Sequence, residues 1–180
     1  DETETSLNEW KVKTIMTSDN HVSGTDRIQE AVIDIEADVV VNIQGDEPTI
    51  NPLLIDELVQ QFEDSTIEMA TVAGQDIDVE NIMDVNAVKV LLDGGGFAVN
   101  FRREPVETEA GGYYHHMGIY AYRKATLKKF TALAPSKNEL ALKLEQYRAL
   151  DNGIPIKVIL VDKVNKGIDT MDDLKEFDRI

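Results

Sequence analysis

Asp38-Val-Val-Val-Asn-Ile-Gln-Gly-Asp-Glu-Pro48 is the stretch that decides the fold class of this 180-residue chain. Its apolar run has the length of a strand and ends abruptly on a glycine, two carboxylates and a proline. Such a run is typical of a buried parallel strand, and open α/β sheets bind ligands at the carboxyl ends of these strands. The pattern therefore predicts that Asp46 lies where a metal or phosphate ligand would be held. The alternative is a plain strand-to-helix turn, in which Asp46 or Asn51 only caps the next helix.

Length, composition and charge bound the class of protein. With 180 residues, of which 42% are hydrophobic, the chain is long enough to bury the core of one domain. It contains no cysteine, which excludes disulfides and thiolate zinc sites. We expect a cytoplasmic protein without membrane insertion, because no apolar stretch has membrane-spanning length and the acidic start is unlike a signal peptide. The net charge of −16 argues against a nucleic acid partner but suits a divalent cation with a small nucleotide.

Two periodicities alternate along the first half of the chain. Strands are expected over residues 12–17, 38–44 and 68–72. Between them, apolar residues at i, i+3, i+4 and i+7 predict helices over residues 28–35 and 55–62. Strands that alternate with helices are typical of right-handed crossovers, so we expect an α/β fold with a doubly wound, mostly parallel sheet.

The pattern changes from Asn86 onward. Residues 88–93 and 97–101 predict a β-hairpin whose turn is supplied by Gly94, Gly95 and Gly96. No helix pattern or P-loop lysine follows these glycines, so a plain turn is a better interpretation than a phosphate cradle. The elements expected after the hairpin are a polar loop (103–112), a strand (117–122), helices (124–131 and 137–150), a turn (151–153), a strand (156–161) and a helix after Asp169 with Thr170 as its cap.

A set of short motifs occurs in a characteristic order from about Val12 to the C-terminus. The motifs are Asn20-His-Val-Ser-Gly-Thr-Asp-Arg27, Asn42-Ile-Gln-Gly-Asp-Glu-Pro48, Asn86-Ala-Val-Lys-Val90, His116-Met-Gly-Ile-Tyr-Ala-Tyr-Arg123, Leu144-Glu-Gln-Tyr-Arg148 and Gly167-Ile-Asp-Thr170. In this order and spacing the chain resembles the 3-deoxy-manno-octulosonate (KDO) cytidylyltransferases, which are also called CMP-KDO synthetases.

The resemblance implies a glycosyltransferase-A-like nucleotidyltransferase fold, with one domain over residues 1–180 and a β-rich dimerisation and sugar lobe over about 86–123. It implies a homodimer that uses Mg²⁺ to transfer CMP from CTP to KDO, with release of pyrophosphate, for lipopolysaccharide biosynthesis. CTP and KDO would be its small-molecule substrates. The alternatives are a cytidylyltransferase for another ulosonic acid, such as sialic acid, and a non-catalytic dimerising or sugar-binding remnant.

Three residues match the catalytic groups of the family. Asp46 and Asp169 match its two metal-binding aspartates, and each follows an expected strand. As the sugar hydroxyl attacks the α-phosphorus of CTP, charge builds on phosphate oxygens, so oxygen ligands for Mg²⁺ are the first requirement. Helix capping would explain Asp169 on its own. Arg103 matches an arginine that the family places near the sugar acid.

The remaining matches fall around the two substrates. The resemblance places Ser23, Gly24 and Thr25 around the cytosine and Arg27 nearer the sugar acid, although an ordinary capped helix start would look the same. A polyhydroxylated acid needs hydrogen-bonding groups and a cation. On the sugar side there are two alternatives to substrate binding. Glu145 and Arg148 could form an ion pair on the helix surface, and one tyrosine could belong to the core. The other substrate-binding candidates are Gln44, His116, Tyr120, Tyr122, Glu145, Gln146 and Arg148.

The sequence also departs from the family pattern. Arg102 stands where the family has a serine, Glu107 where it often has a proline, and His115 where it usually has a basic residue. These changes lie in the sugar-side lobe, so they affect the prediction of which sugar is bound more than the prediction of cytidylyl transfer. The family's glycine- and arginine-rich loop around the triphosphate has no counterpart before Val12. We therefore expect the chain to be N-terminally incomplete and nearly inactive by itself.

Overall fold

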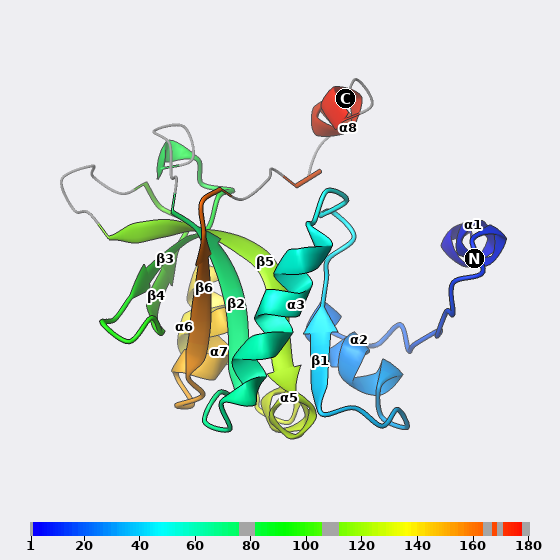
Figure 1. Cartoon of the computed structure of the whole chain (residues 1–180), viewed down its shortest axis with the longest axis horizontal. Coiled ribbons are helices and arrows are strands. Elements are labelled where there is room, and N and C mark those ends of the chain that lie inside the picture. The colour runs from blue at the N-terminus through cyan, green and yellow to red at the C-terminus, as the bar shows by residue number, and fades with distance from the viewer. Residues whose placement is uncertain (1, 76–81, 106–111, 164–166, 169–170, 178–180) are drawn as a thin grey trace. The chain divides into compact units, whose positions relative to one another are not determined.

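The computed structural model describes residues 2–75, 82–105, 112–163, 167–168 and 171–177 (Figure 1). Contacts between residues divide the chain into two units, Asp1–Ala37 and Asp38–Ile180. In the first unit, α1 spans Glu2–Glu9 and α2 spans Gly24–Ala31. The helix expected over residues 28–35 therefore begins one turn earlier and ends halfway through the expected range. None of the helices in the described part of the chain has the length and apolar character needed to span a bilayer.

The strand expected over residues 12–17 is not formed. These residues have no regular structure, and the side chains of Val12, Ile15 and Met16 are exposed. A strand needs a hydrogen-bonded neighbour, and no segment in the described ranges pairs with this one. A local apolar pattern was therefore not sufficient to predict a strand here.

The second unit is built on a six-stranded sheet with the order β4-β3-β5-β2-β6, and β1 also pairs with β5. The expected α/β class is confirmed, but the sheet is mixed and not mostly parallel. β2 and β6 pair in parallel, whereas β5 is antiparallel to β1, β2 and β3. The strands are β1 (Val39–Asn42), β2 (Met69–Gly74), β3 (Lys89–Leu92), β4 (Ala98–Arg102), β5 (Tyr113–Arg123) and β6 (Ile156–Val161).

The insertion of β5 between β1 and β2 explains the mixed pairing. Because β1 and β2 are each antiparallel to β5, they run in the same direction as each other and as β6. The predicted strand–helix–strand connection from β1 through α3 to β2 therefore gives co-directional strands, as expected. What periodicity did not predict is that a strand from the second half of the chain would separate them.

The hairpin of β3 and β4 has the glycine turn that was predicted. The Asp93 carboxylate accepts hydrogen bonds from the amides of Gly95 at 2.8 Å and Phe97 at 2.9 Å, and Gly96 has a φ of +75°. The strands of this region are part of the six-stranded sheet. β3 pairs with the first residues of β5, and the Val158 amide donates to the Gly96 carbonyl at 2.9 Å, so the turn also contacts β6.

Asn51 caps α3 (Pro52–Gln60), which continues into the short 3-10 helix η1 (Gln61–Glu63). The Asn51 side chain accepts a hydrogen bond from the Leu53 amide at 3.0 Å. Of the two candidate caps considered from the sequence, Asn51 therefore takes this role, and Asp46 remains free for another one.

The helix expected over residues 137–150 is two helices, α6 (Lys137–Leu142) and α7 (Gln146–Leu150). Lys143 between them has a left-handed conformation with a φ of +55°. The break lets Leu144 and Tyr147 be buried while Leu140 remains 67% exposed, so these residues do not share one buried face. The other helices are α5 (Lys124–Thr131) and α8 (Met171–Phe177), and the expected cap of α8, Thr170, lies outside the described residues.

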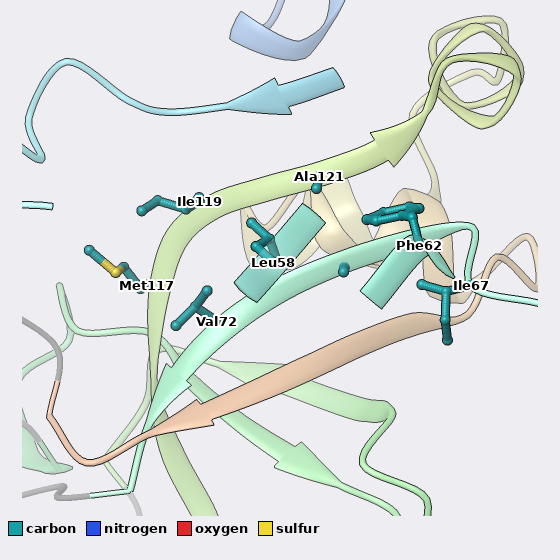
Figure 2. Close-up of a cluster of buried hydrophobic side chains, with 8 residues drawn as sticks. Leu58, Phe62, Ile67, Val72, Met117, Ile119 and Ala121 are labelled. Atoms are coloured by element: carbon teal, nitrogen blue, oxygen red, sulfur yellow. The ribbon is translucent and has the colours of Figure 1, made fainter. Parts of the chain in front are cut away.

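Helices cover both faces of the sheet, with α3 in front and α6 and α7 behind it (Figure 1). On the α3 face, Leu58 and Phe62 pack against apolar side chains of the sheet (Figure 2). The sheet residues of this cluster are Ala70 and Val72 from β2, with Met117, Ile119 and Ala121 from β5. Neighbouring strand residues point to opposite faces, so the alternate positions of β5 face the other helices.

Candidate active site

The carboxyl ends of β1, β2 and β6 lie at one edge of the sheet, because the three strands run in the same direction. Gln44, Gly45 and Asp46 follow β1 at this edge, and Asp46 is exposed. The Ile168 amide donates a hydrogen bond to the Asp46 carbonyl at 2.8 Å. A Cβ atom at Gly167 would lie only 3.2 Å from the same carbonyl oxygen, so glycine permits this close approach. The segment that leads to Asp169 therefore contacts the loop that carries Asp46.

Asp169 itself lies outside the described residues. Within the parts of the chain that are described, no three histidine, aspartate or glutamate side chains form a cluster that could hold a metal ion. Asp46 still offers carboxylate oxygens, which are the ligands that Mg²⁺ prefers. The donor chemistry at this edge thus fits Mg²⁺, with Asp46 as the described ligand candidate.

Asn42 is the last residue of β1 and was not singled out from the sequence. Its side chain is 2% exposed, and its Oδ1 accepts a hydrogen bond from Gln44 Nε2 at 3.0 Å. The Nδ2 atom is buried and has no hydrogen-bond partner among the described residues. A buried donor without a partner costs about 1–3 kcal/mol, so Asn42 marks a position that a bound polar group would satisfy.

Tyr120 lies opposite Asn42 in the pairing of β1 with β5, so the two side chains share a face. Gln146 Nε2 donates a hydrogen bond to the Tyr120 hydroxyl. Gln146 is 9% exposed, and its Oε1 lacks a hydrogen-bond partner within the described ranges. Burial raises the pKa of Tyr120 well above its ordinary value, so the hydroxyl stays neutral. Within the described residues, Asn42, which pairs with Tyr120, therefore keeps a free donor, and Gln146, which bonds to Tyr120, keeps a free acceptor.

His116 lies on the same face and is 7% exposed. Its Nε2 is 3.0 Å from the hydroxyl oxygen of Thr71, and its ring packs edge-on against Phe101 with centroids 5.2 Å apart. Burial, together with the nearby charges of His115 and Arg103, lowers the pKa of His116 to about 3. The imidazole is therefore neutral at physiological pH.

Two of the expected sugar-side residues are packed into the fold. Tyr122 is fully buried between the rings of Tyr120 and Phe130, as expected for a core tyrosine. Arg148 is 3% exposed and pairs with Glu139, through Nε–Oε2 at 3.0 Å and Nη2–Oε1 at 2.5 Å. The expected ion pair between Arg148 and Glu145 has an N–O distance of 3.7 Å. The Arg148 guanidinium is thus already engaged with carboxylates of its own chain.

Arg103 is partly exposed. Its Nη1 donates to the Asn86 carbonyl at 3.1 Å, and its own carbonyl accepts from Lys89 Nζ at 2.7 Å. The buried Lys89 also donates to the carbonyls of Asp84 and Ala87, at 2.7 and 2.8 Å. Lys89 therefore ties the segment before β3 to the segment after β4 and fixes the backbone of Arg103.

The candidates expected around the cytosine belong to the first unit. Ser23 caps α2, since its hydroxyl accepts a hydrogen bond from the Asp26 amide at 3.1 Å. Gly24 and Thr25 form the first turn of this helix, and Arg27 Nη1 donates to the Thr17 hydroxyl at 2.5 Å. The capped helix start considered from the sequence is confirmed, and it leaves the role in base recognition a prediction.

Comparison with known proteins decides the family. The profile of the cytidylyltransferase family matches residues 1–159. The 3-deoxy-manno-octulosonate cytidylyltransferase of Lawsonia intracellularis (strain PHE/MN1-00) is 42% identical over 178 residues, which cover 94% of this chain and 70% of that protein. The chain belongs to the 3-deoxy-manno-octulosonate cytidylyltransferase family. The relative of that name from Bradyrhizobium sp. (strain ORS 278) is 42% identical over 174 residues, covering 92% of this chain and 71% of the relative.

A solved structure agrees with this family assignment. CMP:2-keto-3-deoxy-manno-octonic acid synthetase complexed with CTP superposes with a TM-score of 0.90 at 34% identity. The superposition covers 98% of this chain and 75% of that structure. The nucleotidyltransferase fold expected from the motifs is therefore confirmed for this member of the 3-deoxy-manno-octulosonate cytidylyltransferase family.

Two buried polar residues of this cytidylyltransferase were missed by sequence reasoning. Asn42 stands at the end of an apolar run and Thr71 in the middle of a wholly buried strand. A polar side chain at such a position needs a partner, and that requirement is the signal that could have pointed to both residues. Their partners, Gln44 and His116, follow from the fold and could not be read from spacing alone.

Proposed function

We propose that the protein transfers CMP from CTP to KDO and releases pyrophosphate. The names of its relatives and the CTP-bound neighbour support this activity. The observation that carries the proposal in the chain itself is the hydrogen bond between Ile168 and Asp46, because it joins the two acid motifs at the ligand-binding edge of the sheet.

The reaction sets clear demands on the site. The anomeric hydroxyl oxygen of the sugar forms a bond to the α-phosphorus of CTP, and the bond from that phosphorus to the bridging oxygen breaks. Pyrophosphate leaves with the bonding electrons, and the hydroxyl proton passes to solvent. Mg²⁺, when bound, neutralises charge on the phosphate oxygens. We assign Asp46 and Asp169 as its ligands, which the contact between Asp46 and the Gly167–Ile168 segment supports.

We assign the sugar acid to the face of β5 that carries His116 and Tyr120. Asn42 Nδ2 and Gln146 Oε1 are the free donor and acceptor that its hydroxyls would satisfy. Arg103 is our candidate for binding the sugar carboxylate, because the Arg148 guanidinium already pairs with Glu139. Tyr122 from β5 itself, and Glu145 and Arg148 from the helix side, then support this face. By the motif resemblance, Ser23, Gly24 and Thr25 are assigned to the cytosine and Arg27 to the sugar acid, and Gln44 stays a substrate-binding candidate.

We further propose that the protein is a homodimer formed through residues 86–123 and that it serves lipopolysaccharide biosynthesis. The motif resemblance motivates both assignments. Because CTP is drawn from the cytoplasmic nucleotide pool, we place the reaction in the cytoplasm. Analytical ultracentrifugation at micromolar concentration tests the dimer, and a monomer would contradict it.

The activity is tested with the purified protein preceded by the triphosphate loop of a family member, together with CTP, Mg²⁺ and either KDO or sialic acid, and the products are followed by ³¹P NMR. We expect CMP-KDO and pyrophosphate, and little product from sialic acid. Asp46→Asn is expected to lower kcat/KM on the order of 10³-fold, since the metal supplies several kcal/mol of charge stabilisation. Asp56→Asn, which changes an exposed acid on α3, is the matched control and should retain activity. Formation of CMP-sialic acid alone, or an active Asp46→Asn variant, would contradict the proposal.

A further inference from the structure

The pairing between β2 and β5 is interrupted beside His116. Thr71 pairs with Tyr120, but the next residue, Val72, pairs with Met117, so Gly118 and Ile119 have no paired residue in β2. Such irregularities re-aim side chains and leave backbone groups without ladder partners, and they are frequent next to active sites. Thr71 is fully buried at this point of the sheet.

The hydroxyl of Thr71 lies among three groups at the interruption. Its Oγ1 is 2.6 Å from the Ile119 carbonyl oxygen and 3.4 Å from that of Met117. It is also 3.0 Å from Nε2 of His116. The same hydroxyl therefore joins the irregular part of β5 to the histidine ring.

The hydrogen-bond inventory fixes the direction of these bonds. A threonine hydroxyl has one proton, and a carbonyl oxygen can only accept. At 2.6 Å from the Ile119 oxygen, the hydroxyl must donate there, because two facing lone pairs would repel. Toward His116 the hydroxyl oxygen can then only accept, so Nε2 carries the proton. Nδ1 of the neutral ring is consequently an unprotonated acceptor.

Packing holds the ring in this orientation. The His116 ring lies edge-on against Phe101 and 5.5 Å from Tyr120, whose hydroxyl is held by Gln146. Within the part of the chain that is described, the bond to Thr71 is the hydrogen bond made by the imidazole. The Nδ1 lone pair thus remains available on the face of β5 that also carries Tyr120, which pairs with Asn42 and is bonded to Gln146.

We propose that Thr71 is a positioning residue for sugar recognition. Its hydroxyl holds His116 as the Nε2–H tautomer, so that Nδ1 accepts a hydrogen bond from a hydroxyl group of the sugar acid. The identity of the sugar acid rests on the proposed function, whereas the tautomer does not. Thr71 acts through His116 and touches no substrate itself.

The tautomer is tested by imidazole ¹⁵N NMR, which is practical because the chain has only 3 histidines. We expect Nε2–H for His116 in the wild-type protein and in Thr71→Ser, which keeps the hydroxyl. Thr71→Val is nearly isosteric but lacks the hydroxyl, so its spectrum should shift toward a mixture of tautomers. Thr126→Val, at another buried threonine, is the matched control and should leave the His116 spectrum unchanged.

Kinetics test the consequence for the sugar. Thr71→Val is expected to raise KM for KDO roughly tenfold, which corresponds to one hydrogen bond, with KM for CTP and kcat changed less than about threefold. Thr71→Ser should restore KM for KDO. Addition of KDO to the wild-type protein should move the Nδ1 resonance upfield, as expected for a nitrogen that accepts a hydrogen bond, and this measurement needs no variant.

Each contrary result has a separate meaning. A wild-type spectrum with the proton on Nδ1 overturns the assignment of the tautomer, whatever the activity. An Nδ1 resonance that does not respond to KDO, in a protein that makes CMP-KDO, overturns the role of Thr71 in sugar recognition. Absence of CMP-KDO formation by the protein preceded by the triphosphate loop of a family member overturns the proposed function and the sugar part of the inference together, while the spectrum still decides the tautomer.

Discussion

The two faces of the central sheet are both buried, but different interactions hold them. On the α3 face, Leu58 packs against Val72 and Ile119, and every member of the cluster is apolar. On the opposite face, Tyr120 and Arg148 are buried through hydrogen bonds and an ion pair. An apolar face requires only matching volume, whereas a buried polar face requires a specific partner for each group. The sugar site that we propose accordingly lies on the face where some buried polar atoms have no partner among the described residues.

Neighbouring residues of β5 serve the two faces. Ile119 points into the apolar cluster, and Tyr120 points toward Gln146 and Asn42. Away from the carboxyl edge, the polar groups satisfy one another, as Arg148 and Glu139 do. At that edge, Asn42 Nδ2 and Gln146 Oε1 have no partner among the residues described. The polar groups away from the carboxyl edge thus have their partners within the fold, whereas those at the edge would gain partners from a bound molecule.

The largest expected difference between the faces is their response to acid. Burial lowers the pKa of His116 from 6.5 to about 3, so the unfolded chain takes up a proton at a higher pH than the folded one. This contribution to the free energy of unfolding is fully present above pH 6.5 and is lost as the pH falls from 6.5 toward 3. Over that range it amounts to about 5 kcal/mol.

Urea unfolding between pH 7 and pH 4 measures this effect. The free energy of unfolding of the wild-type protein should fall more steeply with acid than that of His116→Gln, which keeps a nitrogen donor for Thr71. Leu58→Ala, on the apolar face, should lower stability by a similar amount at every pH. Equal slopes for the wild-type protein and His116→Gln would show that His116 is not held neutral by the fold.

The next largest effect concerns the buried ion pair. Arg148→Ala leaves the Glu139 carboxylate without its buried partner, and we expect a loss of about 3–5 kcal/mol in the free energy of unfolding. Leu58→Ala should cost a comparable amount, about 2–5 kcal/mol, through the cavity that it leaves. Denaturant unfolding at pH 7 measures both changes.

The stability lost in Arg148→Ala should be recoverable by a second substitution that removes the charge of Glu139. The double variant Arg148→Met with Glu139→Leu replaces the pair by apolar groups and should recover most of the stability lost in Arg148→Ala. A double variant as unstable as Arg148→Ala would mean that packing of the arginine over Phe130, at 5.0 Å from the ring centroid, matters more than its charge.

The smallest effect is a gain in stability. Lys143 has a φ of +55° between α6 and α7, a conformation that costs a non-glycine residue about 1–2 kcal/mol. Lys143→Gly removes this strain but adds freedom to the unfolded chain, so a net gain of about 0.5–1 kcal/mol is expected. Thermal unfolding measures it, with Ala141→Gly, at an exposed position within α6, as a destabilising control. A loss of stability in Lys143→Gly would show that the left-handed conformation of Lys143 does not destabilise the fold.

Strong local periodicity predicted much of the fold. Apolar spacing gave α3 and β6, and the glycine run gave the turn of the β3–β4 hairpin. The break at Lys143 could not be predicted, because Leu140, Leu144 and Tyr147 keep helical spacing across it. The insertion of β5 between β1 and β2 was also missed, since pairing partners are set by contacts far apart in the sequence.

The sequence predicted the position of the candidate site but not all of its contacts, because contacts between residues far apart in the sequence are not visible in local spacing. The motif around Asp46 pointed to the correct edge of the sheet, where the structure places the Gly167–Ile168 segment. The engagement of Arg148 by Glu139 was not foreseen, because a helical spacing of three residues drew attention to Glu145 instead.

The parallel pairing of β2 with β6 also has a consequence for the protein during its synthesis. β2 ends at Gly74 and β6 begins at Ile156, so the outer edge of β2 has no neighbour until that late segment leaves the ribosome. At about 5–20 residues per second, the delay is roughly 4–16 s. Throughout that time a wholly buried, apolar strand presents an open edge to other nascent chains. Translation that stalls between the two strands would therefore favour aggregation, and chaperone protection would matter most in that interval.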